Sequence, residues 1–206
     1  MKLKYNYKTT DRIFWTSDTH FSHKNIMKYC ERPFDSIEEM NNTIIRNWNN
    51  VVSPGDIVFH LGDFAFGTIA QWEDMRSQLN GDIHLILGNH DFHIYTNYLE
   101  RLEKMFLSVT MQQVVEVGKH KILMNHYPFL TFGGVYREKN PVWQLHGHVH
   151  LKQNSKGADM TRLQYALPLQ YDVGVDLNDF TPVSFDEIHS IISEQIKTGN
   201  NSLMWI

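Results

Sequence analysis

The residues of this sequence that could do chemistry are mainly its histidines, together with aspartates and asparagines near them. The chain contains 12 histidines among 206 residues, and histidine is both a proton donor and acceptor near neutral pH and the commonest metal ligand. Only one cysteine is present, Cys30, so a structural zinc site built on thiolates is excluded. Any metal would be held by His, Asp, Glu or Asn. Five short clusters contain most of these candidates: Asp18-Thr19-His20, Gly62-Asp63, Gly88-Asn89-His90-Asp91, Asn125-His126 and Gly147-His148-Val149-His150.

The spacing within these clusters favours a shared centre. Asp18 and His20 are two residues apart, as are His148 and His150, and in extended backbone such pairs point to the same face. Gly62 and Gly88 precede candidate ligands and would let the backbone turn tightly beside an ion. A single Asp or His after a strand is more often a cap or a half-exposed polar residue. Five clusters, each closing an apolar run, favour a metal site.

The elements that must position these clusters alternate between strands and helices. We expect strands at 11–17, 57–61, 83–87, 143–150 and 171–175, and a hairpin from 114–117 to 122–124 around Gly118-Lys119. Capping boxes at Ser36–Glu39 and Ser184–Glu187 predict helices that run to Asn49 and to Gly199, and further helices are expected at 69–79 and 97–104. Strand, helix, strand is typical of an α/β layer, in which groups at the carboxyl ends of strands gather at one edge.

Composition limits the class of protein and its surroundings. Apolar residues form 42% and charged residues 20% of a 24.3 kDa chain, which predicts one globular domain over residues 1–206. No apolar run approaches a membrane span and no export signal is evident, so we expect a cytoplasmic protein without membrane contact. The net charge of -4 and the lack of a basic block make nucleic acid a possible but not a favoured partner.

The ordered set of motifs D-x-H, GD, GNH[DE], H and GHxH over residues 18–150 resembles the calcineurin-like metallophosphoesterases. The run Asp172–Asp176 with Pro182-Val183-Ser184 is similar to the small predicted phosphoesterases of bacteria and phages within that group. The resemblance implies an α/β fold, a four-layer α-β-β-α sandwich of two mixed sheets with a dinuclear metal site at the strand ends. It implies two ligand sets that share a bridging Asp63: Asp18, His20, Asp63 and His150 for the first metal, and Asp63, Asn89, His126 and His148 for the second.

The resemblance also implies how such a site would work. Two ions about 4 Å apart can hold a hydroxide for in-line attack on phosphorus and neutralise the phosphoryl oxygens. With nitrogen and oxygen ligands, the plausible pair of divalent ions comes from Mn, Fe, Zn, Ni and Co. His90 would act beside the substrate as general acid or transition-state stabiliser, with Asp91 orienting its ring. The family pattern often continues GD-x-x-D-R, whereas Phe66-Gly67 stand there in this chain, so an arginine grip is not expected at that position.

Residues outside the motifs could contact the substrate. His23 and Asn25 follow the first cluster and could line the pocket, although a polar helix start explains them equally well. Arg32 and Arg137 could each clamp a phosphate, although a lone surface arginine is usually only solvated. Gly133-Gly134 makes residues 129–142 a candidate lid, and a second loop is expected at 151–169. Six other histidines are interpreted as structural: His60, His84, His93, His120, His146 and His189. Of these, His146 could also donate a hydrogen bond to a metal ligand.

The function expected from these features is a metal-dependent phosphoesterase. A small phosphodiester or nucleotide-like substrate is preferred to a phosphomonoester, since a small domain without a basic stripe suits a compact substrate. Two alternatives remain open. One is a nuclease of the same family, which the acidic net charge weakens. The other is a catalytically silent metal-binding scaffold of the same fold, for which His90 is the discriminating residue.

Overall fold

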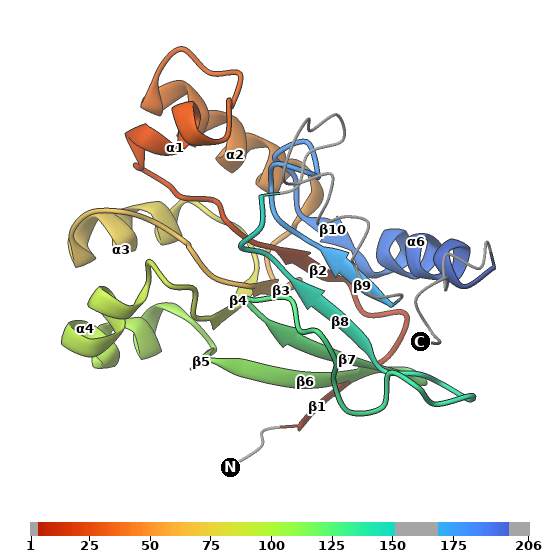
Figure 1. The fold of residues 1–206 in the computed structure, drawn as a ribbon. Coiled ribbons are helices and arrows are strands. Elements are labelled where there is room, and N and C mark those ends of the chain that lie inside the picture. Colours follow the sequence, from red (N-terminus) through yellow and green to blue (C-terminus); the bar gives the residue numbers. More distant parts are fainter. Residues whose placement is uncertain (1–3, 151–168, 198–206) are drawn as a thin grey trace.

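Two five-stranded sheets form the centre of the protein (Figure 1). The computed structural model describes residues 4–150 and 169–197. The first sheet has the order β10-β2-β3-β4-β5 and the second the order β1-β6-β7-β8-β9. The strands are β1 (Lys4–Tyr7), β2 (Ile13–Thr16), β3 (Ile57–His60), β4 (Asp82–Ile86), β5 (Ser108–Thr110), β6 (Gln112–Val117), β7 (His120–Asn125), β8 (Trp143–His146), β9 (Gln170–Asp172) and β10 (Val183–Ser184).

Both sheets are mixed, and their parallel strands determine where the clusters lie. In the first sheet β2, β3, β4 and β5 run parallel, and only β10 is antiparallel. In the second, β7, β8 and β9 run parallel, whereas β6 and β7 form the predicted antiparallel hairpin. The five clusters follow β2, β3, β4, β7 and β8 directly. They therefore gather where the carboxyl ends of the two sets of parallel strands meet.

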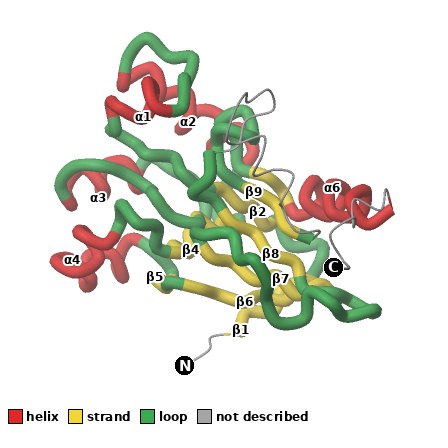
Figure 2. Tube along the Cα trace, in the orientation of Figure 1, coloured by secondary structure: helices red, strands yellow, loops and turns green. Residues whose placement is uncertain are grey.

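Helices cover one face of the first sheet, and a further helix lies beside edge strands of both sheets (Figure 2). Helices α1 (Lys24–Tyr29), α2 (Ile37–Val51), α3 (Ile69–Ser77) and α4 (Phe92–Met105) follow the strands of the first sheet, and α6 (Phe185–Lys197) contacts β2, β9 and β10. Both predicted helix starts are confirmed, because the Ser36 and Ser184 hydroxyls accept the Glu39 and Glu187 N–H groups. The Glu187 side chain also accepts the Ser184 N–H, which completes that capping box, whereas the Glu39 side chain accepts the Asp35 N–H instead. No helix in the described ranges is long and apolar enough to cross a membrane.

The core consists of two apolar layers, one on each face of the first sheet. Along β2, Ile13 and Trp15 pack between the sheets, and Phe14 packs against the helices. This alternation is the two-residue period of a strand with both faces buried. The layer between sheets also takes in Trp143 from β8 and Ile188 from α6. The predicted α/β class with two mixed sheets and helices is confirmed.

Three differences from the expected elements affect the site or its frame. The strand expected at 143–150 ends at His146, so the last histidines lie in a turn. Helix α4 starts at Phe92 rather than near 97 and contains a non-helical residue, Tyr98 (φ -140°). Strands β1, β5 and β10 were not expected, because segments of two to four residues carry little periodicity. The predicted helix end at Gly199, and all of the 151–169 loop except Leu169, fall outside the described residues.

Candidate metal centre

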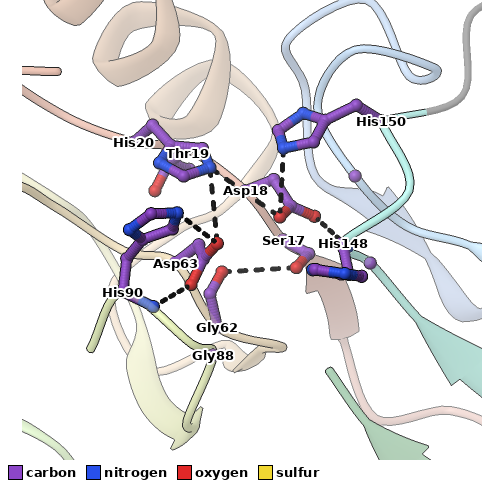
Figure 3. Close-up of polar contacts among 12 residues, drawn as sticks. Ser17, Asp18, Thr19, His20, Gly62, Asp63, Gly88, His90, His148 and His150 are labelled. Atoms are coloured by element: carbon purple, nitrogen blue, oxygen red, sulfur yellow. Dashed lines mark hydrogen bonds and ion pairs between the residues drawn. The ribbon is translucent and has the colours of Figure 1, made fainter. Parts of the chain in front are cut away.

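The predicted ligands from the two sheets converge on one site. Asp18 Oδ1 lies 4.0 Å from His20 Nε2 and 3.7 Å from His150 Nε2. These three side chains form a group whose candidate ligand atoms all lie within 4.8 Å of one another. Figure 3 shows that the rings of His20 and His150 approach the Asp18 carboxylate from different loops. These are three of the four donors expected for the first ion, Asp63 being the fourth.

Asp63 lies between this group and a second one. Its Oδ2 atom is 3.5 Å from His20 Nε2 and also 3.5 Å from His126 Nε2. Asp18, Asp63 and His126 form a further group within 4.8 Å, and Asn89 Oδ1 lies 3.1 Å from His126 Nε2. The His148 ring lies beside the ring of His126, with centroids 5.0 Å apart. A central carboxylate with histidines on both sides has the geometry needed for a bridge between two ions.

Left-handed backbone, rather than extended strand, aims most of these side chains. Five predicted ligands have positive φ: Asp18 (57°), His20 (48°), Asp63 (56°), His148 (71°) and His150 (49°). The expectation that the two i, i+2 pairs lie on extended backbone is therefore wrong. Each pair lies in a turn beyond its strand, where strand alternation no longer applies. Positive φ is uncommon for residues with a side chain and is concentrated at functional sites.

Glycine lets the ligand-bearing turns approach one another. Gly62 has φ +101°, and a Cβ atom there would lie 2.8 Å from His126 Nδ1 and would overlap the backbone nitrogen of Gly88. Gly147 lies against Ser17 and Asp18 so closely that a Cβ atom would overlap both side chains. Gly62 thus confirms the tight turn expected before Asp63.

The donors suit a cation, because their lone pairs point at one another. His126 Nδ1 is 2.8 Å from the Leu61 carbonyl and must donate to it, which leaves Nε2 of the neutral ring as an acceptor facing the Asn89 oxygen. His20 Nδ1 and Nε2 and Asp18 Oδ1 are buried and have no hydrogen bond to the described residues. Buried polar atoms without hydrogen-bond partners are costly, and a cation among them would satisfy the Asp18 oxygen and the unprotonated His20 nitrogen. Nitrogen and carboxylate oxygen ligands are those of first-row transition metals.

The carboxylates that lie close together at the site shift the pKa values of Asp63 and His150. Burial, Asp18 and Asp91 raise the pKa of Asp63 to about 8. Burial opposes the charged form of His150, but Asp18, Asp176 and Cys30 raise its pKa to about 11. Both raised pKa values favour the protonated side chains in the absence of a bound cation. Binding of a divalent cation would release such protons.

Asp91 supports the turns instead of orienting the His90 ring. Its buried carboxylate accepts the N–H groups of Asp63, Phe64 and Gly88 at 2.8, 3.0 and 2.8 Å. These bonds join the turns that follow β3 and β4. The interpretation of Asp91 as the orienter of His90 is therefore replaced by a backbone role.

Buried His60 and His146 also hold backbone near the ligands. The Thr19 hydroxyl donates to the Phe64 carbonyl and lies 2.9 Å from His60 Nε2, so the turns after β2 and β3 are tied through His60. Burial lowers the pKa of His60 to about 3 and that of His146 to about 4. His146 Nδ1 lies 3.1 Å from the Gly147 carbonyl. Both rings are neutral parts of the frame.

His90 lies at the open side of the centre, next to two other rings. Its backbone N–H donates to Asp63 Oδ1 at 2.9 Å, and its ring Nε2 lies 4.0 Å from Asp63 Oδ2 with 44% of the side chain exposed. The rings of His23 and Phe66 stack with centroids 3.7 Å apart, and Phe66 lies 5.0 Å from His90. We call His23 and Phe66 the ring wall. Phe66 occupies the position where the family pattern often has its second aspartate.

The remaining predicted substrate residues are distributed differently. Asn25 is exposed on α1, and Arg137 is exposed in the 127–142 loop. The Arg32 side chain is 0% exposed and bonds Asp176, so the expected phosphate clamp gives way to an internal role. Burial raises the pKa of Asp176, but His150 and Arg32 outweigh it and hold the value at about 2. Asp176 is a residue that sequence reasoning missed, because it lies outside every metal-ligand spacing; its only signal was the 172–176 run.

This fold and donor set agree with the comparisons to known proteins. Residues 12–164 match the calcineurin-like phosphoesterase superfamily domain, so the chain belongs to that superfamily. The predicted family is thereby confirmed.

Relatives of similar length are known in archaea, phages and bacteria. An uncharacterized protein of Methanocaldococcus jannaschii is 34% identical over 189 residues, covering 89% of this chain and 92% of that protein. The Gene 66 protein of Mycobacterium phage L5 is 28% identical over 203 residues, covering 87% of this chain and 93% of that protein. The crystal structure of protein AQ665 from Aquifex aeolicus, of unknown function, aligns with a TM-score of 0.66 at 25% identity, covering 88% of this chain and 100% of that one. The similarity thus extends over nearly the whole length of each.

Proposed function

We propose that the protein is a dinuclear metal-dependent phosphoesterase whose substrate is a small phosphodiester or a nucleotide-like ester. The observation that supports it is the central place of Asp63, with Oδ2 3.5 Å from both His20 Nε2 and His126 Nε2. One carboxylate in that place can serve two ions. The full ligand proposal is Asp18, His20, Asp63 and His150 for one ion, and Asp63, Asn89, His126 and His148 for the other.

The residues of the chain have distinct tasks in this proposal. When bound, two divalent ions supply an activated water at neutral pH and offset charge on the phosphoryl oxygens. Asp18 and Asp63 provide two negative charges, so the loaded site stays positive and attracts a phosphate group. His90 lies at the open side and would hold a proton for the leaving oxygen or contact the phosphoryl group. Partial burial and His126 lower the pKa of His90, whereas the negative charge of a bound phosphate would favour its protonated form.

The ring wall supports the preference for an ester with a flat group. Phe66 and His23 stack on one another beside His90, and the surface of this pair that faces the centre would meet the organic group of the ester. Stacking on aromatic rings favours planar groups such as nucleobases and is worth about 1–3 kcal/mol per base. A simple alkyl phosphomonoester has no planar group that could stack on the ring wall.

The test is metal-dependent turnover of defined reporters. Protein stripped of metal would be reloaded with Mn, Fe, Co, Ni or Zn and assayed with bis-p-nitrophenyl phosphate, p-nitrophenyl phosphate, cyclic nucleotides and single-stranded DNA. We expect metal-dependent diester hydrolysis, and we expect His90→Ala to keep both ions but lose turnover by about 10²–10⁴-fold. His93→Ala, an exposed histidine on α4, is the matched control and should stay active.

Each alternative has its own outcome in this experiment. Two bound ions without turnover of any reporter would favour the silent scaffold. Salt-sensitive cleavage of DNA in preference to the small esters would favour the nuclease. Equal turnover by wild type and His90→Ala would contradict the role given to His90.

A further inference from the structure

A buried carboxylate holds the outer nitrogen of one predicted ligand. His150 Nδ1 lies 2.7 Å from Asp176 Oδ2, and the Asp176 side chain is 1% exposed. Both Asp176 oxygens also accept from the Arg32 guanidinium, so the carboxylate is the acceptor toward His150 and Nδ1 must donate. The opposite ring nitrogen, Nε2, is thereby directed at Asp18 Oδ1, 3.7 Å away.

Arg32 fixes that carboxylate and the turn that carries two other ligands. Its Nε and Nη2 atoms donate to the two Asp176 oxygens, both at 2.9 Å. The same guanidinium donates to the carbonyls of Asp18 and Thr19 at 2.7 and 3.0 Å. Planar bidentate pairing of this kind gives geometric specificity as well as energy. The buried Arg32 guanidinium therefore joins the turn after β2 to Asp176, and through Asp176 to His150.

We propose that Asp176 and Arg32 are positioning residues that fix the ring orientation of His150 for metal binding. Without the Asp176 bond, the ring of His150 could rotate and either nitrogen could face the centre. A carboxylate on the far nitrogen selects one tautomer and raises the basicity of the ligand. The proposal rests on the proposed function, because it requires that His150 binds an ion.

A different use of the same residues is a separate metal site, since Cys30, His150 and Asp176 also form a group within 4.8 Å. Arg32 argues against it. Both Asp176 oxygens already accept bonds from the guanidinium, whose positive charge would repel a second cation there. The geometry therefore favours support for the main centre.

The experiment compares two substitutions that break the same kind of pair. Asp176→Asn removes the charge but keeps the size of the side chain. Asp56→Asn is the matched control, because Asp56 is also buried and accepts from Arg12 Nε at 3.0 Å with both oxygens, at the opposite end of β3 from the ligands. Calorimetric titration of Mn²⁺ or Zn²⁺ into metal-free protein would measure the affinity of each ion, and urea denaturation would measure stability.

We expect Asp176→Asn to lower the affinity for one of the two ions by about 10–100-fold and to leave the affinity for the other near the wild-type value. Asp56→Asn should leave both affinities unchanged whatever it does to stability. If both variants lose stability and neither loses metal affinity, Asp176 is only structural and the proposal is overturned. If the wild type itself binds no ion, the proposed function has failed rather than this inference.

A second measurement uses the wild-type protein and does not depend on whether Asp176→Asn folds. In wild-type protein loaded with Zn²⁺ and labelled with ¹⁵N at histidine, the His150 ring should show a protected Nδ1–H resonance that His150→Gln removes. A His150 ring bound to zinc through Nδ1 would carry no proton there, and that result would also overturn the proposal.

Discussion

At the scale of single residues, the ligands lie in conformations that their side chains disfavour. Asp18, His20, Asp63, His148 and His150 all have φ between 48° and 71°, a region that non-glycine residues enter at a cost of roughly 1 kcal/mol or more. Asp63 carries a second penalty, since it is buried near Asp18 and Asp91. The site is thus held together against its own local preferences, and the surrounding hydrogen bonds must maintain it.

Asp63→Asn should make the metal-free protein more stable but should weaken metal binding. The pKa of Asp63 is raised above that of an unfolded aspartate, from 3.8 to about 8, so its ionisation destabilises the metal-free fold increasingly as pH rises from 4 to 8. Asparagine removes that penalty and accepts positive φ well. We expect the metal-free variant to be more stable than wild type by about 1–3 kcal/mol at pH 8 and by less at pH 5, measured by urea denaturation.

The same variant should bind both ions more weakly, because a bridging carboxylate serves each of them. Metal analysis after dialysis would measure this loss. Normal occupancy of both ions in Asp63→Asn would show that Asp63 is not the bridge.

At the scale of elements, the turns after parallel strands act as the ligand carriers, and glycine sets their separation. A Cβ atom added at Gly62, after β3, would overlap the backbone of Gly88 after β4 and the ring of His126 after β7. The turns are further tied through Asp91 and through the Thr19–His60 pair. A change in one turn should therefore reach ligands carried by the others.

Gly62→Ala tests this coupling, with Gly55→Ala as its control. Both glycines have positive φ, +101° and +88°, but a Cβ atom at Gly55 meets nothing within 4 Å. Both substitutions should cost about 1 kcal/mol for the left-handed backbone. Gly62→Ala should cost about 1–3 kcal/mol more through the clash and should reduce metal affinity. Equal stability losses with unchanged metal affinity in both variants would refute the close approach.

At the scale of the whole molecule, the two sheets are joined partly through a buried histidine. His84 of β4 stacks on Phe59 of β3 at 4.7 Å and meets Tyr5 of β1, in the other sheet, at 4.8 Å. Its Nδ1 atom lies 2.7 Å from the Ser108 hydroxyl. Burial lowers the pKa of His84 from 6.5 to about 4. The interface between the sheets therefore prefers neutral imidazole.

This preference predicts acid sensitivity of the fold itself. Because the folded pKa is lowered, the stability that His84 contributes is present above pH 6.5 and is lost as pH falls toward 4. Between pH 7 and pH 5 the loss from this one ring is about 2 kcal/mol. Urea denaturation of metal-free protein should show a smaller loss over this interval in His84→Gln than in wild type. The exposed His93→Gln should behave as wild type, and an unchanged profile in His84→Gln would contradict the assignment.

Much of this protein follows from local sequence signals. The β6–β7 hairpin, the helix starts at Ser36 and Ser184, and the order of the ligand clusters could all be predicted, because periodicity, caps and motif spacing act within a few residues. The placement of those clusters at strand ends also followed, since parallel strands bring their carboxyl ends to one edge.

Only the tertiary structure decided how the side chains are aimed and which residues support them. The His148 N–H group donates to Asp18 across 130 residues, and Arg32 meets Asp176 across 144. Left-handed turns replace extended backbone at the ligands, Asp91 binds backbone, and Arg32 is buried. No local pattern specifies such contacts, because their energy is gained only when segments far apart in the chain pack together, and that packing can override the backbone preference of each residue.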